Sequence, residues 1–335
     1  MTVNNKIKLF TLPSDFKMVK PGRPNLDNQT AAEEKAAQIA LTAGLETDLE
    51  GASLQLDWYQ GPDQKTWIGK IPGEEFMDTV HEVAIGNLFR KAHIKAPPMT
   101  VSQVRAHDSS VKIYGLEEGR LYFSTMSKKI KDFQELGQEF ADAFRSHPRP
   151  GPLTVKTKEH GTVPVQGFWR LAAFAKWYGD IDFLGVTGKN TGYQIKMENN
   201  LPVAKIVKID PGSAAMSLNA FEKGKNNMDL ADKDIYFDMR SGISFADLSE
   251  EEKKEFLTSI AEIVQLTDKQ ILSFVKDIVS IENIPEEFSS YKAIVEEEQE
   301  TLFAYLVQRR EELKKVYQED LMRAGLIPAP SCVLI

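Results

Sequence analysis

The spacing of apolar residues in the first third of the chain predicts a small sheet with one long helix. Apolar and polar positions alternate over residues 54–58, Gly61-Pro62-Asp63 forms a turn signal, and residues 66–71 resume the extended pattern, as in a β-hairpin. Apolar positions then recur at helical spacing over residues 74–93, which predicts a helix. It should end before Pro97-Pro98, because a residue preceding proline disfavours the helical conformation.

Shorter signals flank this region. Residues 1–30 are polar and turn-rich and are interpreted as an arm or extended lead-in. The Ala-, Glu- and Lys-rich stretch 29–41 predicts a helix. Two further short strands are expected at 111–114 and 120–126, on either side of Glu117-Glu118-Gly119.

The pattern becomes mainly helical after residue 133. Helices are expected at 133–147 and 168–177, separated by a Pro- and Gly-bearing loop at 148–167. Long charged amphipathic stretches at roughly 249–280 and 286–324 predict further helices.

Composition narrows the class of protein. The 335 residues are 42% hydrophobic and 27% charged, which is typical of a globular chain long enough for one large or two ordinary domains. The single cysteine, Cys332, excludes an internal disulfide framework and favours a reducing compartment. With a net charge of −8 and interleaved basic residues, no nucleic-acid partner is expected.

The candidate chemistry lies between Tyr178 and Ala215. A loop with two carboxylates, Asp180 and Asp182, also holds Asn190, and a predicted hairpin then leads to Asp210-Pro211-Gly212. A hairpin brings residues just before and just after it to the same end of the sheet. We therefore expect Asn190 and Asp210 to lie close together although they are twenty positions apart.

These residue types suit phosphoryl transfer. Magnesium prefers oxygen ligands such as carboxylates and amide carbonyls, and Asn190 and Asp210 can supply them. A further carboxylate near the attacking hydroxyl can orient it and accept its proton. Asp182 is the candidate for this role, with Asp180 as the alternative.

The order of loop acid, loop asparagine, hairpin and Asp-x-Gly resembles the catalytic and metal-binding loops of the protein kinase-like superfamily. The resemblance implies a lysine on the third strand of a small sheet, paired with a helix glutamate. Lys70 ends the stretch TWIGK and Glu82 lies mid-helix, with Glu74 or Glu75 as alternative partners of the lysine. The helix that stops before Pro97-Pro98 looks like the corresponding helix of the HipA-type and phosphatidylinositol kinase-like branches. The stretched catalytic loop and its Ile-Asp-Pro-Gly ending are similar to those of effector kinases of intracellular bacteria.

The resemblance implies a fold as well as a site. The expected fold class is α+β, a two-lobed protein kinase-like fold with a small antiparallel-sheet N-lobe bearing one helix and a larger, mainly helical C-lobe, and with ATP between them. Expected boundaries are an arm and helix at 1–45, the N-lobe at 46–127, the C-lobe at 128–325 and a tail at 326–335. Met126, just before the helical half, is where a hinge would contact adenine.

The last four residues, Cys332-Val333-Leu334-Ile335, fit a C-a-a-X prenylation signal with geranylgeranyl-type preference. Cys332 would then be lipidated by a eukaryotic prenyl transferase. Because one prenyl chain alone gives reversible binding, we expect a protein peripheral on membranes in a eukaryotic, possibly host, cytosol.

Together these features predict a kinase that uses ATP and Mg²⁺ or Mn²⁺ to phosphorylate a hydroxyl of a protein or a phosphoinositide. Lys70 and Glu82 would hold the phosphates. Two alternatives stay open: a catalytically inactive kinase fold that serves as a membrane-tethered binding module, and a kinase fold repurposed for another transfer such as nucleotidylation or glutamylation. No Gly-x-Gly-x-x-Gly loop precedes Leu54, which favours the first of them.

Overall fold

The structure is a computed structural model in which the chain divides into two compact units. The first comprises Met1–Ala84, Pro97–Lys129 and Ser280–Lys292, and the second Ile85–Ala96, Ile130–Val279 and Ala293–Ile335. The structure describes residues 9–20, 55–71, 76–106, 117–146, 152–222, 232–238, 241–280 and 284–328. The helix predicted at 29–41, the strand predicted at 111–114 and Cys332 lie outside these residues.

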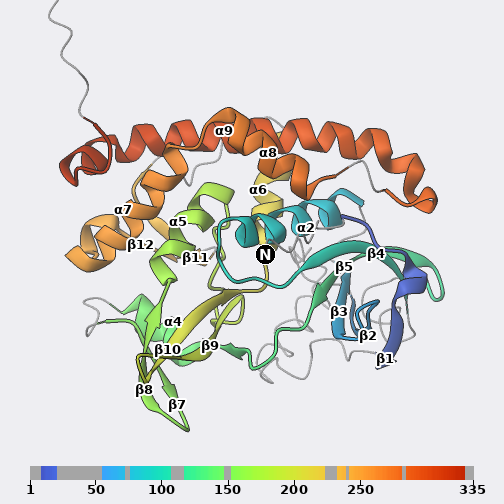
Figure 1. Cartoon of the computed structure of the whole chain (residues 1–335), viewed down its shortest axis with the longest axis horizontal. Coiled ribbons are helices and arrows are strands. Elements are labelled where there is room, and N and C mark those ends of the chain that lie inside the picture. The colour runs from blue at the N-terminus through green and yellow to red at the C-terminus, as the bar shows by residue number, and fades with distance from the viewer. Residues whose placement is uncertain are drawn as a thin grey trace, which may run out of the picture. The chain divides into compact units, whose positions relative to one another are not determined.

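The first unit is built on a five-stranded antiparallel sheet (Figure 1). Its strand order is β1-β2-β3-β5-β4, and every neighbouring pair is antiparallel. The predicted hairpin is confirmed as β2 and β3, and the strand predicted at 120–126 is β5. The strands are β1 (Lys17–Lys20), β2 (Gln55–Gln60), β3 (Thr66–Ile71), β4 (Met99–Arg105) and β5 (Leu121–Lys128).

Residues 9–20 of the predicted arm or extended lead-in belong to this sheet. After the short 3-10 helix η1 (Pro13–Asp15), β1 pairs with β2. Phe10 bridges to Val101 of β4 and has 1% of its surface exposed. Because β1 precedes the hairpin, Lys70 lies on the third strand of the sheet.

Helix α2 (Phe76–Lys91) follows β3, as the apolar spacing predicts. Its apolar positions Val80, Val83, Ala84 and Leu88 are all fully buried, so the periodic face is the one that packs inward. In the chain, this helix follows the third strand of the sheet and precedes the fourth. A small antiparallel sheet with one α-helix among the described residues of the unit is therefore confirmed.

A segment from late in the sequence also belongs to the first unit. The 3-10 helix η5 (Glu286–Tyr291) contributes Phe288, whose ring lies 5.1 Å from that of Phe10, and Tyr291, whose ring lies 4.4 Å from that of Phe76. Both rings also contact Phe123 of β5. Aromatic clusters of this kind bury large apolar areas and fasten the late segment to the sheet.

The second unit contains a five-stranded sheet of its own, which the sequence pattern did not predict in full. The expected loop at 148–167 is wrong, because it holds a hairpin formed by β7 and β8. The strand order is β6-β9-β10-β8-β7, with β10 and β8 parallel. These strands are β6 (Gln134–Glu135), β7 (Thr154–Thr157), β8 (Gly161–Gln166), β9 (Thr191–Glu198) and β10 (Leu201–Lys208), and a separate hairpin joins β11 (Ile235–Asp238) to β12 (Ser241–Ile243).

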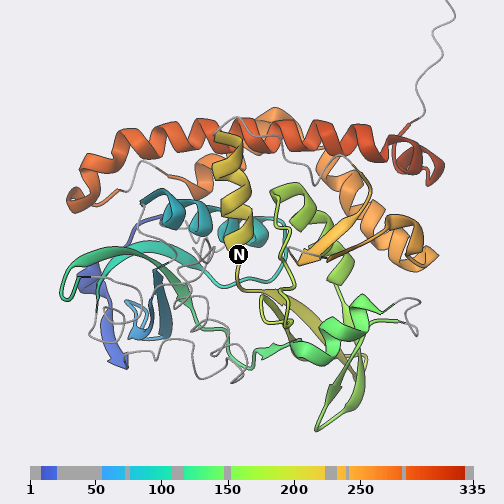
Figure 2. The same cartoon turned by 180° about the vertical axis from the view of Figure 1, so that it is seen from behind.

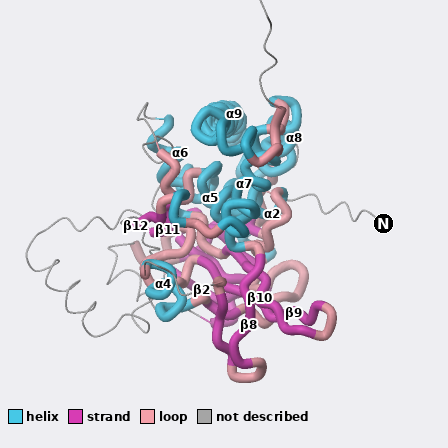
Figure 3. The backbone as a smooth tube through the Cα atoms, turned by 90° about the vertical axis from the view of Figure 1, so that its left-hand side faces the viewer, coloured by secondary structure: helices cyan, strands magenta, loops and turns pink. Residues whose placement is uncertain are grey.

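Helices predominate in the rest of this unit, which confirms the expected α+β class with a mainly helical second part. Figure 3 shows the strands β8, β9 and β10 on one side and the helices α5, α7 and α9 on the other. The helices are α4 (Gly137–Arg145), α5 (Phe168–Tyr178), α6 (Gly212–Glu222), α7 (Glu250–Val264), α8 (Asp268–Ile278) and α9 (Lys292–Arg323), with the 3-10 helix η4 at Phe245–Asp247.

Helix α9 ties α5 and α6 together, and it runs past both of them in opposite views (Figures 1 and 2). The hydroxyl of Tyr305 donates to the Tyr178 carbonyl at 3.1 Å, and its ring lies 5.2 Å from that of Phe221. The buried Arg309 donates from Nε to the Trp177 carbonyl at 2.7 Å.

Among the described residues, no helix is both long and apolar enough to cross a membrane.

Candidate functional site

The loop between α5 and β9 begins at a buried carboxylate. Helix α5 ends at Gly179, and the backbone N–H of Asp180 donates to the Ala175 carbonyl at 2.8 Å. This places the Asp180 side chain in the interior, where it is fully buried. A carboxylate so enclosed is shielded from a substrate hydroxyl, and its partners give it a positioning role instead.

Asp182 and Asn190 meet across the loop. The Asn190 Nδ2 donates to the Asp182 carbonyl at 2.9 Å and to the Asp182 Oδ2 at 3.0 Å. Two glycines make the eight-residue spacing possible. Gly185 and Gly188 have φ of 78° and 71°, and a Cβ on Gly185 would lie 2.9 Å from the Asn190 side chain. Only glycine adopts this conformation readily and leaves room for the amide.

The β9–β10 hairpin brings Asn190 and Asp210 together, as the sequence predicts. Thr191 pairs with Lys208 at the open end of the hairpin, and the backbone N–H groups of Ile209 and Asp210 lie 3.3 and 3.4 Å from the Asn190 carbonyl oxygen. The turn at the other end is a two-residue turn. Its residues Asn199 and Asn200 have φ of 49° and 64°, the conformation that suits a tight hairpin.

A buried lysine that the sequence analysis missed holds the site together. The Nζ of Lys208 lies 3.0 Å from the Asp180 Oδ2, and the two side chains are 1% and 0% exposed. The same amine donates to the carbonyls of Phe183 (3.2 Å), Asn190 (3.3 Å) and Asp210. Lys208 thus connects the start of the loop, its asparagine and the Asp-Pro-Gly turn. The available signal was a lysine within an apolar strand directly before the candidate metal ligand.

The environment of Asp182 favours its protonated form. Burial, together with the negative charges of Asp180, Asp210 and Asp238, raises the pKa of Asp182 to about 7, against the opposing effect of Lys208. A carboxyl with a pKa near neutral pH is matched to accepting and returning a proton. Of the two candidate aspartates, Asp182 is therefore the one whose pKa is raised toward neutral pH, and its role as a general base stays a prediction.

A further ion pair braces the far side of the loop. Arg145 donates from Nε and from a terminal nitrogen to the Asp238 Oδ2, at 3.1 and 2.9 Å, and also to the Val186 carbonyl. The backbone N–H of Leu184 donates to the Phe237 carbonyl at 3.0 Å. The loop is consequently fixed by helix α4 and strand β11 as well as by Lys208.

The oxygen donors fit a magnesium ion that is shared with phosphates. The amide nitrogen of Asn190 is engaged by Asp182, which leaves its Oδ1 as the ligand atom, and the Asp210 Oδ1 accepts from the Gly212 N–H at 3.1 Å. Within the described residues, no group of three or more His, Cys, Asp or Glu side chains could enclose a metal ion. Magnesium at phosphoryl-transfer sites uses one or two carboxylates plus phosphate oxygens, so the donor set matches that use.

In the first unit, Lys70 and Glu82 form the predicted pair. The Lys70 Nζ lies 3.0 Å from the Glu82 Oε1, with side-chain exposures of 13% and 3%. Strand β3 supplies the lysine and helix α2 the glutamate. The structure thus brings these two residues together, while their role toward phosphates stays a prediction.

Met126 lies on the other face of the sheet from Lys70. Lys70 pairs with Thr125, whereas Met126 pairs with Gly69, and neighbouring residues of a strand point to opposite faces. The Met126 side chain is fully buried in a cluster with Tyr59 and Trp67, so it packs the sheet instead of facing the side that carries Lys70.

Strand β5 also continues to Lys128, and the boundary between units falls after Lys129. An adenine contact by the backbone near Met126 stays a prediction.

Comparisons with known proteins give limited information. No family model matches the chain, and no curated protein matches it. Seven chains of solved structures match, among them the crystal structure of a Helicobacter pylori proinflammatory kinase, CtkA. That match covers 81% of this chain and 95% of CtkA, with a TM-score of 0.45 and 11% sequence identity. Similarity at this level transfers no residue role to this chain.

Proposed function

We propose that this protein is a kinase-like phosphotransferase that uses ATP and a divalent metal. The observation that carries the proposal is the set formed by Asp182, Asn190 and Asp210, which the hairpin and the buried Lys208 hold in one loop cluster. A second support is the Lys70–Glu82 ion pair between the third strand of the antiparallel sheet and helix α2. Phosphoryl transfer needs these two groups of residues and little covalent chemistry from the protein.

Each residue then has a defined task. Lys70, oriented by Glu82, binds phosphate oxygens of ATP. The Asp210 carboxylate and the Asn190 amide oxygen hold the metal, which neutralises charge on the phosphates when it is bound. Asp182 orients the acceptor hydroxyl and takes its proton, and burial and the neighbouring carboxylates raise its pKa in the metal-free protein. Positioning and charge stabilisation supply most of the rate.

The direct test is transfer of labelled γ-phosphate from ATP with Mg²⁺ or Mn²⁺, offered separately to a protein extract and to phosphoinositide liposomes. We expect label in one of the two pools, and an Asp210→Asn variant should lose at least about 100-fold of the rate. Label in the protein pool identifies a protein acceptor, and label in the liposomes a lipid acceptor. No transfer to either pool, and no rise of melting temperature with ATP and metal, would leave an inactive binding module as the better description.

The ion pair in the first unit gives a separate prediction. Lys70→Met should reduce the transfer rate roughly 100- to 1000-fold, because it removes a charge aimed at the phosphates, and Glu82→Gln should reduce it less. Lys65→Met is the matched control, since this lysine is exposed in the turn directly before the strand that carries Lys70. Steady-state kinetics of the three variants check the order. Equal rates for Lys70→Met and Lys65→Met would remove Lys70 from the site.

We also propose that the protein acts at membranes of a eukaryotic cytosol through a prenyl group on Cys332. This requires that Ile335 be the natural carboxyl terminus. A lipid-tethered enzyme meets membrane-bound acceptors more often than soluble ones, which favours a phosphoinositide or a membrane-associated protein as substrate. In a eukaryotic cell, Cys332→Ser should move the protein from the membrane to the soluble fraction; an unchanged distribution after fractionation would refute the anchor.

A further inference from the structure

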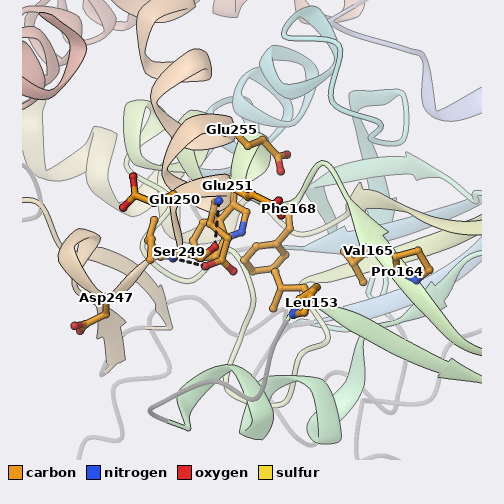
Figure 4. A pocket seen from close by; sticks show the side chains of 13 residues that line it. Leu153, Pro164, Val165, Phe168, Asp247, Ser249, Glu250, Glu251 and Glu255 are labelled. Carbon is orange, nitrogen blue, oxygen red and sulfur yellow. Dashed lines mark hydrogen bonds between the residues drawn. The ribbon is translucent and has the colours of Figure 1, made fainter. Parts of the chain in front are cut away.

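The second unit has a cavity that the proposed phosphoryl transfer does not use. It has a volume of about 850 Å³ and lies between the β7–β8 hairpin, the start of helix α5 and the first two turns of helix α7. Neither Asp182 nor Asn190 nor Asp210 lines it. Figure 4 shows the side chains that form it.

One wall of this cavity is apolar. Leu153, Pro164 and Val165 lie beside the ring of Phe168 (Figure 4), and Trp169 completes the wall. The backbone N–H of Val165 donates to the Leu153 carbonyl at 2.9 Å, so two of these residues are held side by side by the hairpin. Phe168 and Trp169 are anchored in the core with 1% and 3% exposure. The accessible apolar surface of the wall therefore comes mainly from Leu153, Pro164 and Val165.

The opposite wall is acidic. It carries five carboxylates and, among the described residues that line the cavity, no lysine or arginine; the five are Asp247, Glu250, Glu251, Glu252 and Glu255. Helix capping explains part of this set, since the Ser249 N–H donates to the Glu252 Oε2 at 2.9 Å in a capping box. The dipole of α7 also favours acidic residues in its first turn.

Capping and the helix dipole do not account for the whole acidic wall. Asp247 precedes the helix, and Glu255 lies beyond its first turn. Glu255 accepts from the Arg170 N–H at 3.3 Å, and burial raises the pKa of its carboxyl. Lys253 pairs with Glu250 at 3.1 Å, so the negative charge that a ligand would meet beside the apolar wall comes mainly from Asp247 and Glu251, and a positively charged ligand would complement it.

We propose that this cavity docks a short segment of a partner protein that carries an apolar side chain flanked by lysine or arginine. The apolar wall would take the apolar side chain, and the carboxylates of Asp247 and Glu251 would face the flanking positive charges. A volume of 850 Å³ lies in the range of ligand-binding pockets. A bound metal ion is a poorer occupant, because the described carboxylates form no cluster that could enclose one. A metal ion would also make no favourable contact with the apolar wall.

The probe for this docking site is a fluorescein-labelled peptide of alternating arginine and leucine, about eight residues long, titrated with the full-length protein and followed by fluorescence anisotropy. We expect a Kd on the order of 10–100 μM at low salt, weakening as salt screens the charges. A peptide with serine in place of leucine and a peptide with glutamate in place of arginine should each bind at least about tenfold more weakly.

Two variants locate the binding. Glu251→Lys reverses a charge on the acidic wall, and Leu153→Ser removes an apolar side chain from the other wall; each should weaken binding about tenfold. Glu319→Lys on α9 is the charge-matched control and should bind like the wild type, and circular dichroism checks that all three are folded. Any of four results would overturn the proposal. The serine peptide could bind as tightly as the leucine peptide, or spermine could displace the probe as strongly as the unlabelled peptide does. Both wall variants could keep the wild-type affinity, or no binding could be seen at about 1 mM. Because the readout is binding, it is independent of whether the protein transfers phosphate.

Discussion

Replacing Lys208 by methionine is expected to lower the free energy of unfolding of the second unit by about 3–5 kcal/mol. Lys208 and Asp180 form an ion pair at 3.0 Å in which neither side chain is more than 1% exposed. Removal of the amine leaves the Asp180 carboxylate buried without its counter-charge, and three backbone carbonyls lose a donor. The cost of an uncompensated buried charge exceeds that of the lost contacts. Urea unfolding followed by circular dichroism measures the difference.

Two further variants separate the buried charge from ordinary effects of losing a lysine. Lys205 is on the same strand and pairs with Glu198 at 2.7 Å, with exposures of 34% and 45%, so Lys205→Met should cost no more than about 1 kcal/mol. The double variant Lys208→Met with Asp180→Leu should recover most of the loss, because a buried ion pair can be replaced by apolar residues at little net cost. A Lys208→Met protein as stable as the Lys205→Met protein would show that the buried pair is not what holds this loop.

Much of the site could be predicted because its geometry is local. Asn190 and Asp210 flank a hairpin whose turn and strands are visible in the sequence, so their proximity follows from the register alone. Lys70 and Glu82 were paired through the resemblance to the protein kinase-like superfamily, which implies a lysine on the third strand and a glutamate on the helix. Lys208 was missed because its partners come from separate parts of the loop, and nothing in the strand pattern identifies Asp180 as the buried counter-charge.

The missed strands have a common physical reason. Strand β4 buries Thr100 and Ser102, at 4% and 0% exposure, so polar residues occupy inward positions where an apolar pattern is expected. The β7–β8 hairpin contains Pro164 and borders Gly161 and Gly167, residues that usually mark loops. In both cases pairing with a neighbouring strand outweighs the local preference, and that pairing is not encoded in the segment itself.

Asp182→Asn is expected to change activity and stability in opposite directions. Loss of the general base should reduce the transfer rate by about 100- to 10,000-fold. The same change should stabilise the metal-free protein at pH 8, because the amide mimics the protonated carboxyl that the site favours. Burial and the charges of Asp180 and Asp210 are the main causes of that preference.

The pH dependence follows from the direction of the shift. The pKa of Asp182 in the folded unit, about 7, lies above the usual value of 3.8, so the folded unit binds this proton more tightly than the unfolded chain. The stability that this proton contributes is fully present below about pH 4 and is lost as the pH rises through about 7. Asp182→Asn retains an uncharged side chain throughout, so its melting temperature should exceed that of the wild type at pH 8 and match it at pH 4.

The melting temperatures are measured with EDTA and without nucleotide, since a bound cation would favour the ionised carboxylate. Asp132→Asn is the control, because Asp132 is an exposed carboxylate in the same unit, at 77% exposure, and should leave both activity and melting temperature unchanged. A rise in stability at pH 8 together with the loss of transfer would place the raised pKa and the catalytic role on the same carboxyl. An inactive variant whose melting temperature does not rise at pH 8 would show that the raised pKa and the catalytic role belong to different groups. A fully active variant would exclude Asp182 as the base. At Asp182 the native carboxyl lowers stability and supports activity. This is the behaviour expected where burial keeps the pKa of a carboxyl near neutral pH for proton transfer.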